Sequence, residues 1–192
     1  RRLAAVLGSS TVLMINSEKP VFAPGIFVTS PNAVVKGLWL HVSGEVSTGS
    51  VVRWFKDQFA TVEAEEARKT NKRVYEVLDK EAVKIPIGSR GVTVLEHWQG
   101  SRIHADPFSR GVIWGLSLAI TRAHIFRAIL ETCAYSTNFS IECFKAGGMR
   151  IDSIWAWGGG SRSKLLLQIH ADVCGLPIYL TQVSEAVSLG SA

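Results

Sequence analysis

The sequence predicts an α/β domain in which a β-sheet packs against helices. Three observations support this prediction. The first part of the chain is rich in short β-type segments, the middle has helical periodicity, and the last part reads as strand, glycine turn, helix and strand. With 192 residues, of which 47% are hydrophobic and 19% are charged, the chain is large enough for one domain and apolar enough for a buried sheet.

The opening segment predicts a series of strands. Residues 3–7 and 11–15 alternate in a β-type pattern on either side of Gly8-Ser9-Ser10, which we expect to form a hairpin turn. Residues 26–28 and 34–42 predict two further strands, because β-branched and aromatic residues are frequent there and Gly and Pro separate them.

The middle of the chain is expected to be mainly helical. The predicted elements are helices at 48–59 and 62–82, a short strand at 92–95, a helical turn or two at 111–118, and the longest helix at 123–145. A long loop at 97–107 lies between the predicted strand at 92–95 and the predicted helical turn at 111–118, and long loops often carry functional residues.

Three consecutive glycines near the end form the most informative segment. Gly158, Gly159 and Gly160 follow a predicted buried strand at 151–157 and precede an amphipathic helix, with Ser161 as the candidate N-cap. Without Cβ atoms, such a turn can lie close to a ligand, although many glycine turns only allow a helix to pack tightly on a sheet.

Two common nucleotide-binding motifs do not fit this turn. In the dinucleotide fingerprint the third glycine would fall on Ser163, and no acidic residue ends the next strand at 178–182. The phosphate-binding loop would need Lys followed by Ser or Thr, but Leu165 follows Lys164. The motif Gly-x-Ser-x-Gly of serine hydrolases is also absent.

Four separated segments together resemble the FGGY family of carbohydrate kinases. The segments lie in the order and at the spacing of that family and cover nearly the whole chain. They are Gly8-Ser9-Ser10-Thr11; 44–49 leading to Trp54; Asp106-Pro107, Arg110-Gly111, Gly115-Leu116, His124-Ile125, Arg127-Ala128 and Glu131; and 158–163 with Gln168, Ala171-Asp172, 175–177, Glu185 and 189–192.

The resemblance implies a fold and an activity. The fold would be one lobe of the ribonuclease H-like type, as in actin and the heat-shock ATPases, with a mixed sheet flanked by helices. Residues 1–192 would form the carboxyl-terminal, ATP-binding domain. The activity would be ATP-dependent phosphorylation of a sugar or polyol hydroxyl with Mg²⁺, and the 97–107 loop favours pentulose or polyol kinases within the family.

The resemblance also implies which residues bind the nucleotide. Gly8, Ser9 and Ser10 would contact the β- and γ-phosphates through hydroxyl and amide donors. Gly158, Gly159 and Gly160 would surround the adenosine and the α-phosphate. The remaining expected contacts are Ser163 near the base, Gly49 as a glycine of close approach, and Arg53, for which an exposed helix arginine without a role is the competing interpretation.

Several family elements are expected outside this chain. In the family the aspartate that accepts the proton of the sugar hydroxyl precedes the first glycine turn, so we expect the general base upstream of Arg1 and assign no catalytic residue. The amino-terminal lobe and most sugar contacts would lie further upstream, so the isolated piece should not catalyse. A non-catalytic nucleotide-binding module and an actin-like assembly ATPase are the alternatives.

Other partners are not indicated. The net charge of +5 is spread out, and the densest basic run, at 68–73, lies among glutamates and lacks aromatic residues, unlike a nucleic-acid site. No apolar run approaches a membrane span. The five histidines are scattered and predict no metal site, and three distant cysteines fit a reducing cytoplasm. The oligomeric state, including a homodimer, stays open.

Overall fold

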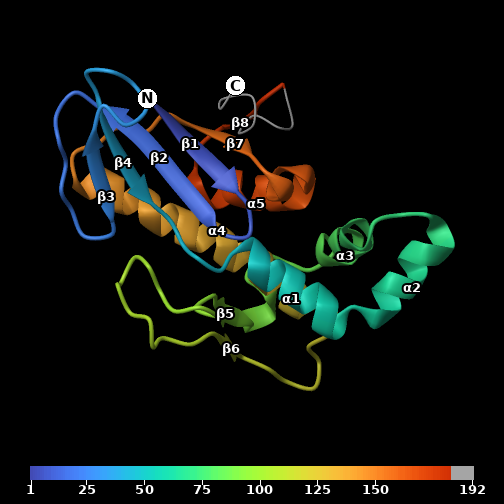
Figure 1. Cartoon of the computed structure of the whole chain (residues 1–192). Helices are drawn as coiled ribbons and strands as arrows, with labels where there is room; N and C mark the ends of the chain where they lie inside the picture. Colours follow the sequence, from blue (N-terminus) through green and yellow to red (C-terminus); the bar gives the residue numbers. More distant parts are fainter. Residues whose placement is uncertain (183–192) are drawn as a thin grey trace.

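A computed structural model describes residues 1–182 and contains a six-stranded sheet with the order β3-β4-β2-β1-β7-β8. Figure 1 shows this sheet in the upper half of the molecule. Its strands are β1 (Arg2–Leu7), β2 (Thr11–Ser17), β3 (Val28–Pro31), β4 (Trp39–Ser43), β7 (Ser153–Trp157) and β8 (Ile178–Leu180).

The sheet is mixed, with β1 in the middle. β1 pairs antiparallel with β2 through the hairpin at Gly8-Ser9-Ser10, and on its other side it pairs parallel with β7. β7 in turn pairs parallel with β8, and the helix α5 (Lys164–Cys174) connects the two strands, as expected for a strand-helix-strand unit. The end of β1 and the end of β7 therefore lie side by side, which brings the two glycine turns together.

Two cores lie on either side of α4 (Arg122–Ala146). The inward-facing residues of β1, β2 and β7 pack on Ile141 and Phe144 of α4 and on Cys174 of α5. The first half of α4 packs instead on α1 (Gly49–Phe59), α3 (Val74–Ala82) and β5 (Thr93–Leu95). Figure 1 shows the sheet above α4, β5 below it, and α1 and α3 toward the right of the molecule.

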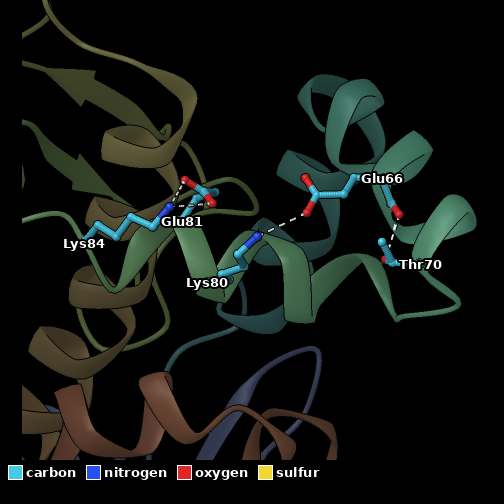
Figure 2. A network of polar contacts seen from close by, with 5 residues as sticks. All are labelled: Glu66, Thr70, Lys80, Glu81 and Lys84. Atoms are coloured by element: carbon cyan, nitrogen blue, oxygen red, sulfur yellow. Dashed lines mark hydrogen bonds and ion pairs between the residues drawn. The ribbon is translucent and has the colours of Figure 1, made fainter.

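The segment 62–82 is not the single helix that its periodicity predicts. It consists of α2 (Thr61–Thr70) and α3, and the break falls at Asn71, whose φ of 53° is left-handed. Asparagine tolerates this conformation better than most residues, which explains why the helix ends there. The exposed bond from Lys80 Nζ to Glu66 Oε1 (3.3 Å) links the two helices, as Figure 2 shows.

Two other expectations need correction. Residues 111–118 were expected to be helical, but Val112–Trp114 form the strand β6, which pairs antiparallel with β5. Two β-branched residues and a tryptophan in three β6 positions favour a strand, and the flanking glycines prevent helix continuation. The strand expected at 34–42 begins only at Trp39.

No helix within residues 1–182 is long and apolar enough to cross a bilayer.

A buried ion pair connects α4 with the turn before β5. Arg127 Nε donates to Glu131 Oε1 at 2.8 Å, and both side chains are less than 10% exposed. Glu131 also accepts from Gly88 N (3.1 Å) and from Ser89 Oγ (3.2 Å). The carboxylate is therefore fully hydrogen-bonded in the core, and it holds the turn at 88–91 against the helix.

We predict that Arg127→Met lowers the free energy of unfolding by about 3 kcal/mol, because it leaves the Glu131 carboxylate buried without its cation. Urea denaturation of the complete protein measures the change. The control Lys145→Met removes an exposed cation from the same helix, and we expect an effect below about 0.5 kcal/mol. Equal effects of the two substitutions would contradict the prediction.

Candidate functional site

One cavity of about 800 Å³ is lined by residues of the two glycine turns and of four helices. The β1–β2 turn and the start of α1 form part of its wall. The 159–163 segment, the start of α5 and one side of α3 form the rest. Phe126, Leu130 and Cys133 of α4 line it together with Leu166 and His170 of α5. The cavity thus has an apolar part between helices and a polar part at the ends of strands.

The β1–β2 turn touches the start of α1 through backbone atoms. Ser50 N donates to Ser9 O at 2.9 Å, and a Cβ atom on Gly49 would lie 2.1 Å from the carbonyl oxygen of Gly8. Only glycine allows the helix to come this close to the turn. The predicted approach of Gly49 to the nucleotide stays a prediction, because the backbone that fills its Cβ position in the structure is the first glycine turn of the protein itself.

The second glycine turn has one structural glycine and one open glycine. Gly158 has a φ of 98°, and a Cβ there would meet the carbonyl oxygen of Leu7 at 2.7 Å. Gly159 has no atom within 4 Å of the Cβ position and lines the cavity. Gly160 also lines it, but packs tightly on Leu7. The bare backbone that faces the cavity is thus provided mainly by Gly159.

The helix after this turn begins two residues later than expected. Ser163, not Ser161, is the N-cap of α5, and its Oγ accepts from Leu166 N at 3.0 Å. Ser161 Oγ instead donates to the carbonyl oxygen of Gly158 at 2.7 Å. The 3₁₀ turn Gly159–Arg162 intervenes between the glycines and the helix, which is why the sequence alone placed the cap too early.

Asp79 of α3 is a cavity residue that the sequence did not indicate. Its Oδ2 accepts from Ser163 Oγ at 2.7 Å, across 84 positions of the chain. Burial raises the pKa of the Asp79 carboxyl above its ordinary value, and the hydrogen bond from Ser163 opposes that rise. No local pattern marks Asp79, because it lies in a charged helix that looks solvated, so no sequence signal could have found it.

The polar lining of the cavity is predominantly basic. Its cations are Arg53, Lys56, Lys72, Arg73 and Arg162, whereas its carboxylates are Glu76 and Asp79. Arg73 pairs with Glu76, and both Arg53 and Lys56 pair with Asp57. Within residues 1–182, neither Lys72 nor Arg162 forms an ion pair at contact distance. This charge distribution favours an anionic ligand.

Seven of the nine residues that the sequence proposed for nucleotide binding line this one cavity. They are Gly8, Ser9, Gly49, Arg53, Gly159, Gly160 and Ser163. Ser10 and Gly158 do not line it. The Ser10 carbonyl accepts from Gly8 N (3.0 Å) within the turn, and Gly158 supports β1. Glu185 and residues 189–192 lie outside the described part of the chain.

A second polar cluster lies outside the cavity lining. Ligand atoms of Glu45, Glu96 and His97 come within 4.8 Å of one another. Glu45 already accepts from Ser101 Oγ (3.1 Å) and from Arg102 N (3.2 Å). Burial, and then the nearby charge of Glu45, raise the pKa of the Glu96 carboxyl. Since a proton can relieve this repulsion as well as a cation, we assign no metal there.

The two adjacent glycines should differ in their tolerance of alanine. We predict that Gly158→Ala lowers the free energy of unfolding by about 1–3 kcal/mol, because its positive φ and the Leu7 carbonyl both oppose a methyl group. Gly159→Ala should change it by less than about 1 kcal/mol, since the space is open. Urea denaturation measures both, and a larger loss for Gly159→Ala would disprove this assignment of roles.

Comparison with known proteins agrees with this architecture. The family model described as "FGGY family of carbohydrate kinases, C-terminal domain" matches residues 3–192. The chain belongs to the FGGY family of carbohydrate kinases. The resemblance of the four separated segments to this family is thereby confirmed.

Individual FGGY relatives are similar over the whole of this chain. A ribulokinase of Mycolicibacterium smegmatis is 30% identical over 193 residues, covering 100% of this chain and 34% of the relative. An FGGY carbohydrate kinase domain-containing protein of Xenopus laevis is 31% identical over 203 residues, covering 100% and 37%. The chain thus spans about a third of the length of these relatives.

A solved FGGY kinase has the same fold. The crystal structure of xylulose kinase from Rhodospirillum rubrum superposes with a TM-score of 0.82 and 26% identity, covering 100% of this chain and 38% of that one. The predicted ribonuclease H-like lobe, with a mixed sheet flanked by helices, is confirmed.

Proposed function

We propose that this chain is the nucleotide-binding lobe of an ATP-dependent kinase that phosphorylates a sugar or polyol hydroxyl. One observation carries the proposal: the two glycine turns, far apart in the sequence, line one basic cavity in a chain of the FGGY family. Phosphoryl transfer depends chiefly on positioning and charge stabilisation, which backbone amides, hydroxyls and cations provide.

The residues around the cavity suit the parts of a nucleoside triphosphate. The open Ser9 hydroxyl and the Ser9 amide are donors for phosphate oxygens, and Arg53 and Lys56 of α1 add positive charge nearby. Gly159 offers bare backbone for close approach. Val74 and Tyr75 of α3 line the cavity and are more exposed than the buried Phe126 and Leu130, so they provide apolar surface of the kind that a base requires.

The described residues do not form a Mg²⁺ site of their own beside the phosphates. The cavity carboxylates, Glu76 and Asp79, both come from α3 and are bonded to Arg73 and Ser163. The first turn and the start of α1 contribute hydroxyls, amides and cations. We propose that Mg²⁺ arrives bound to the phosphate oxygens of ATP, with any protein ligands outside this chain.

The rest of the reaction is assigned to residues beyond this chain. The general base, the sugar pocket and the amino-terminal lobe would lie in the remaining two thirds of an FGGY-length protein. A cytoplasmic location fits the free thiols of Cys133, Cys143 and Cys174. The identity of the acceptor, whether a pentulose or a polyol, is a matter for assay.

We predict that the complete protein forms ADP from ATP in the presence of a ketose or polyol and Mg²⁺. A panel of such acceptors with a coupled ADP assay measures this activity. The chain of residues 1–192 alone should show none, because the proposed base lies outside it. A flat response of the complete protein would favour the non-catalytic alternative, and robust phosphorylation by residues 1–192 alone would refute the assignment of the base.

A substitution at Gly159 tests the nucleotide site itself. We predict that Gly159→Val weakens ATP binding at least about tenfold, because the new side chain occupies open space in the cavity where the backbone should meet the ligand. Gly159→Ala should have a smaller effect, and the melting temperature of both should stay near that of the unchanged protein. Unchanged ATP affinity of Gly159→Val, measured by calorimetry, would contradict the assignment of the nucleotide to this cavity.

A further inference from the structure

The hydroxyl of Ser163 is occupied by bonds within the protein. It donates to Asp79 Oδ2 at 2.7 Å and accepts from Leu166 N at 3.0 Å. A serine hydroxyl has a single proton to donate, and this geometry directs it to the carboxylate. Ser163 therefore has no proton left for a ligand, although it lines the cavity.

Asp79 has a free acceptor atom beside Ser163. Within residues 1–182, no group donates a hydrogen bond to its Oδ1, and the residue lines the cavity. Its position is well fixed, because the neighbouring α3 residues Val77 and Leu78 are buried in the core. A partly buried carboxylate with a fixed position and an unused oxygen is suited to accept a hydrogen bond from a ligand.

The charge of Asp79 restricts which part of a nucleotide can lie next to it. A carboxylate repels phosphate oxygens and accepts from neutral donors. The cavity cations Arg53 and Lys56 lie on another helix, α1, whereas Arg73, the cation that acts electrostatically on Asp79, is paired with Glu76. The phosphates should therefore lie away from Asp79, and the nucleoside should lie next to it.

We propose that Asp79 recognises the nucleoside part of the nucleotide. Its Oδ1 accepts a hydrogen bond from a neutral donor, either a ribose hydroxyl or the amino group of the base, and Ser163 is the positioning residue that holds the carboxylate. The inference rests on the proposed nucleotide site and assigns it a specificity-determining residue.

Calorimetric titration of the complete protein with ATP and three analogues tests the proposal. The analogues are 2′-deoxy-ATP, 3′-deoxy-ATP and purine riboside triphosphate, each of which lacks one candidate donor. We expect the unchanged protein to bind one analogue about tenfold more weakly than ATP, the usual scale for a lost charge-assisted hydrogen bond. Asp79→Asn should bind ATP about tenfold more weakly and no longer discriminate against that analogue.

The matched control is Glu81→Gln, which makes the same chemical change on the same helix. Glu81 does not line the cavity and pairs with Lys84. This variant should bind all four nucleotides like the unchanged protein. If Asp79→Asn also does so, or if the unchanged protein does not discriminate among the nucleotides, the inference is overturned while the proposed function stands. Failure of the unchanged protein to bind ATP overturns both.

The melting temperature distinguishes a ligand contact from a structural one. Burial raises the pKa of Asp79 in the folded state, so the ionised carboxylate disfavours folding at pH values above the ordinary pKa of an aspartate. Asp79→Asn removes this charge and can still accept from Ser163, so its melting temperature should be unchanged or higher. A fall of several degrees, with equal loss of affinity for all nucleotides, would show a structural role and overturn the inference.

Discussion

The structure depends on the close approach of three backbone segments at the end of β1. Gly158 lies against the carbonyl of Leu7, and Gly49 lies against the carbonyl of Gly8. These contacts hold the second glycine turn and the start of α1 next to the β1–β2 turn. The cavity lies beside this point, and residues of α1, α3, α4 and α5 line it.

This constraint separates two roles of glycine that a sequence motif combines. Gly49 and Gly158 are needed because backbone of the protein itself occupies the space where a Cβ would lie. Gly159 has open space instead, so its lack of a side chain serves the cavity. In a family whose motif is written as a run of glycines, the run thus contains residues that support the fold and residues that face the ligand.

The polar network beyond the glycines links distant parts of the chain. Ser163 caps α5 and also bonds to Asp79, so the start of one helix fixes a carboxylate on another. Within α4, the buried pair of Arg127 and Glu131 fixes the turn before β5. Both residues of that pair belong to the motif from Asp106 to Glu131 that resembles the family, which gives this part of the motif a structural explanation.

The sequence by itself determined the α/β architecture and the two glycine turns, because strand alternation, helical periodicity and glycine act locally. Its resemblance to the FGGY family indicated seven of the residues that line the cavity. The sequence failed where tertiary contacts decide. The helix break at Asn71, the strand at Val112–Trp114 and the cap at Ser163 depend on packing and on short-range competition between turn types. Only the tertiary structure revealed Asp79, since its partner lies 84 positions away and a charged helix gives no sign of which carboxylate faces inward.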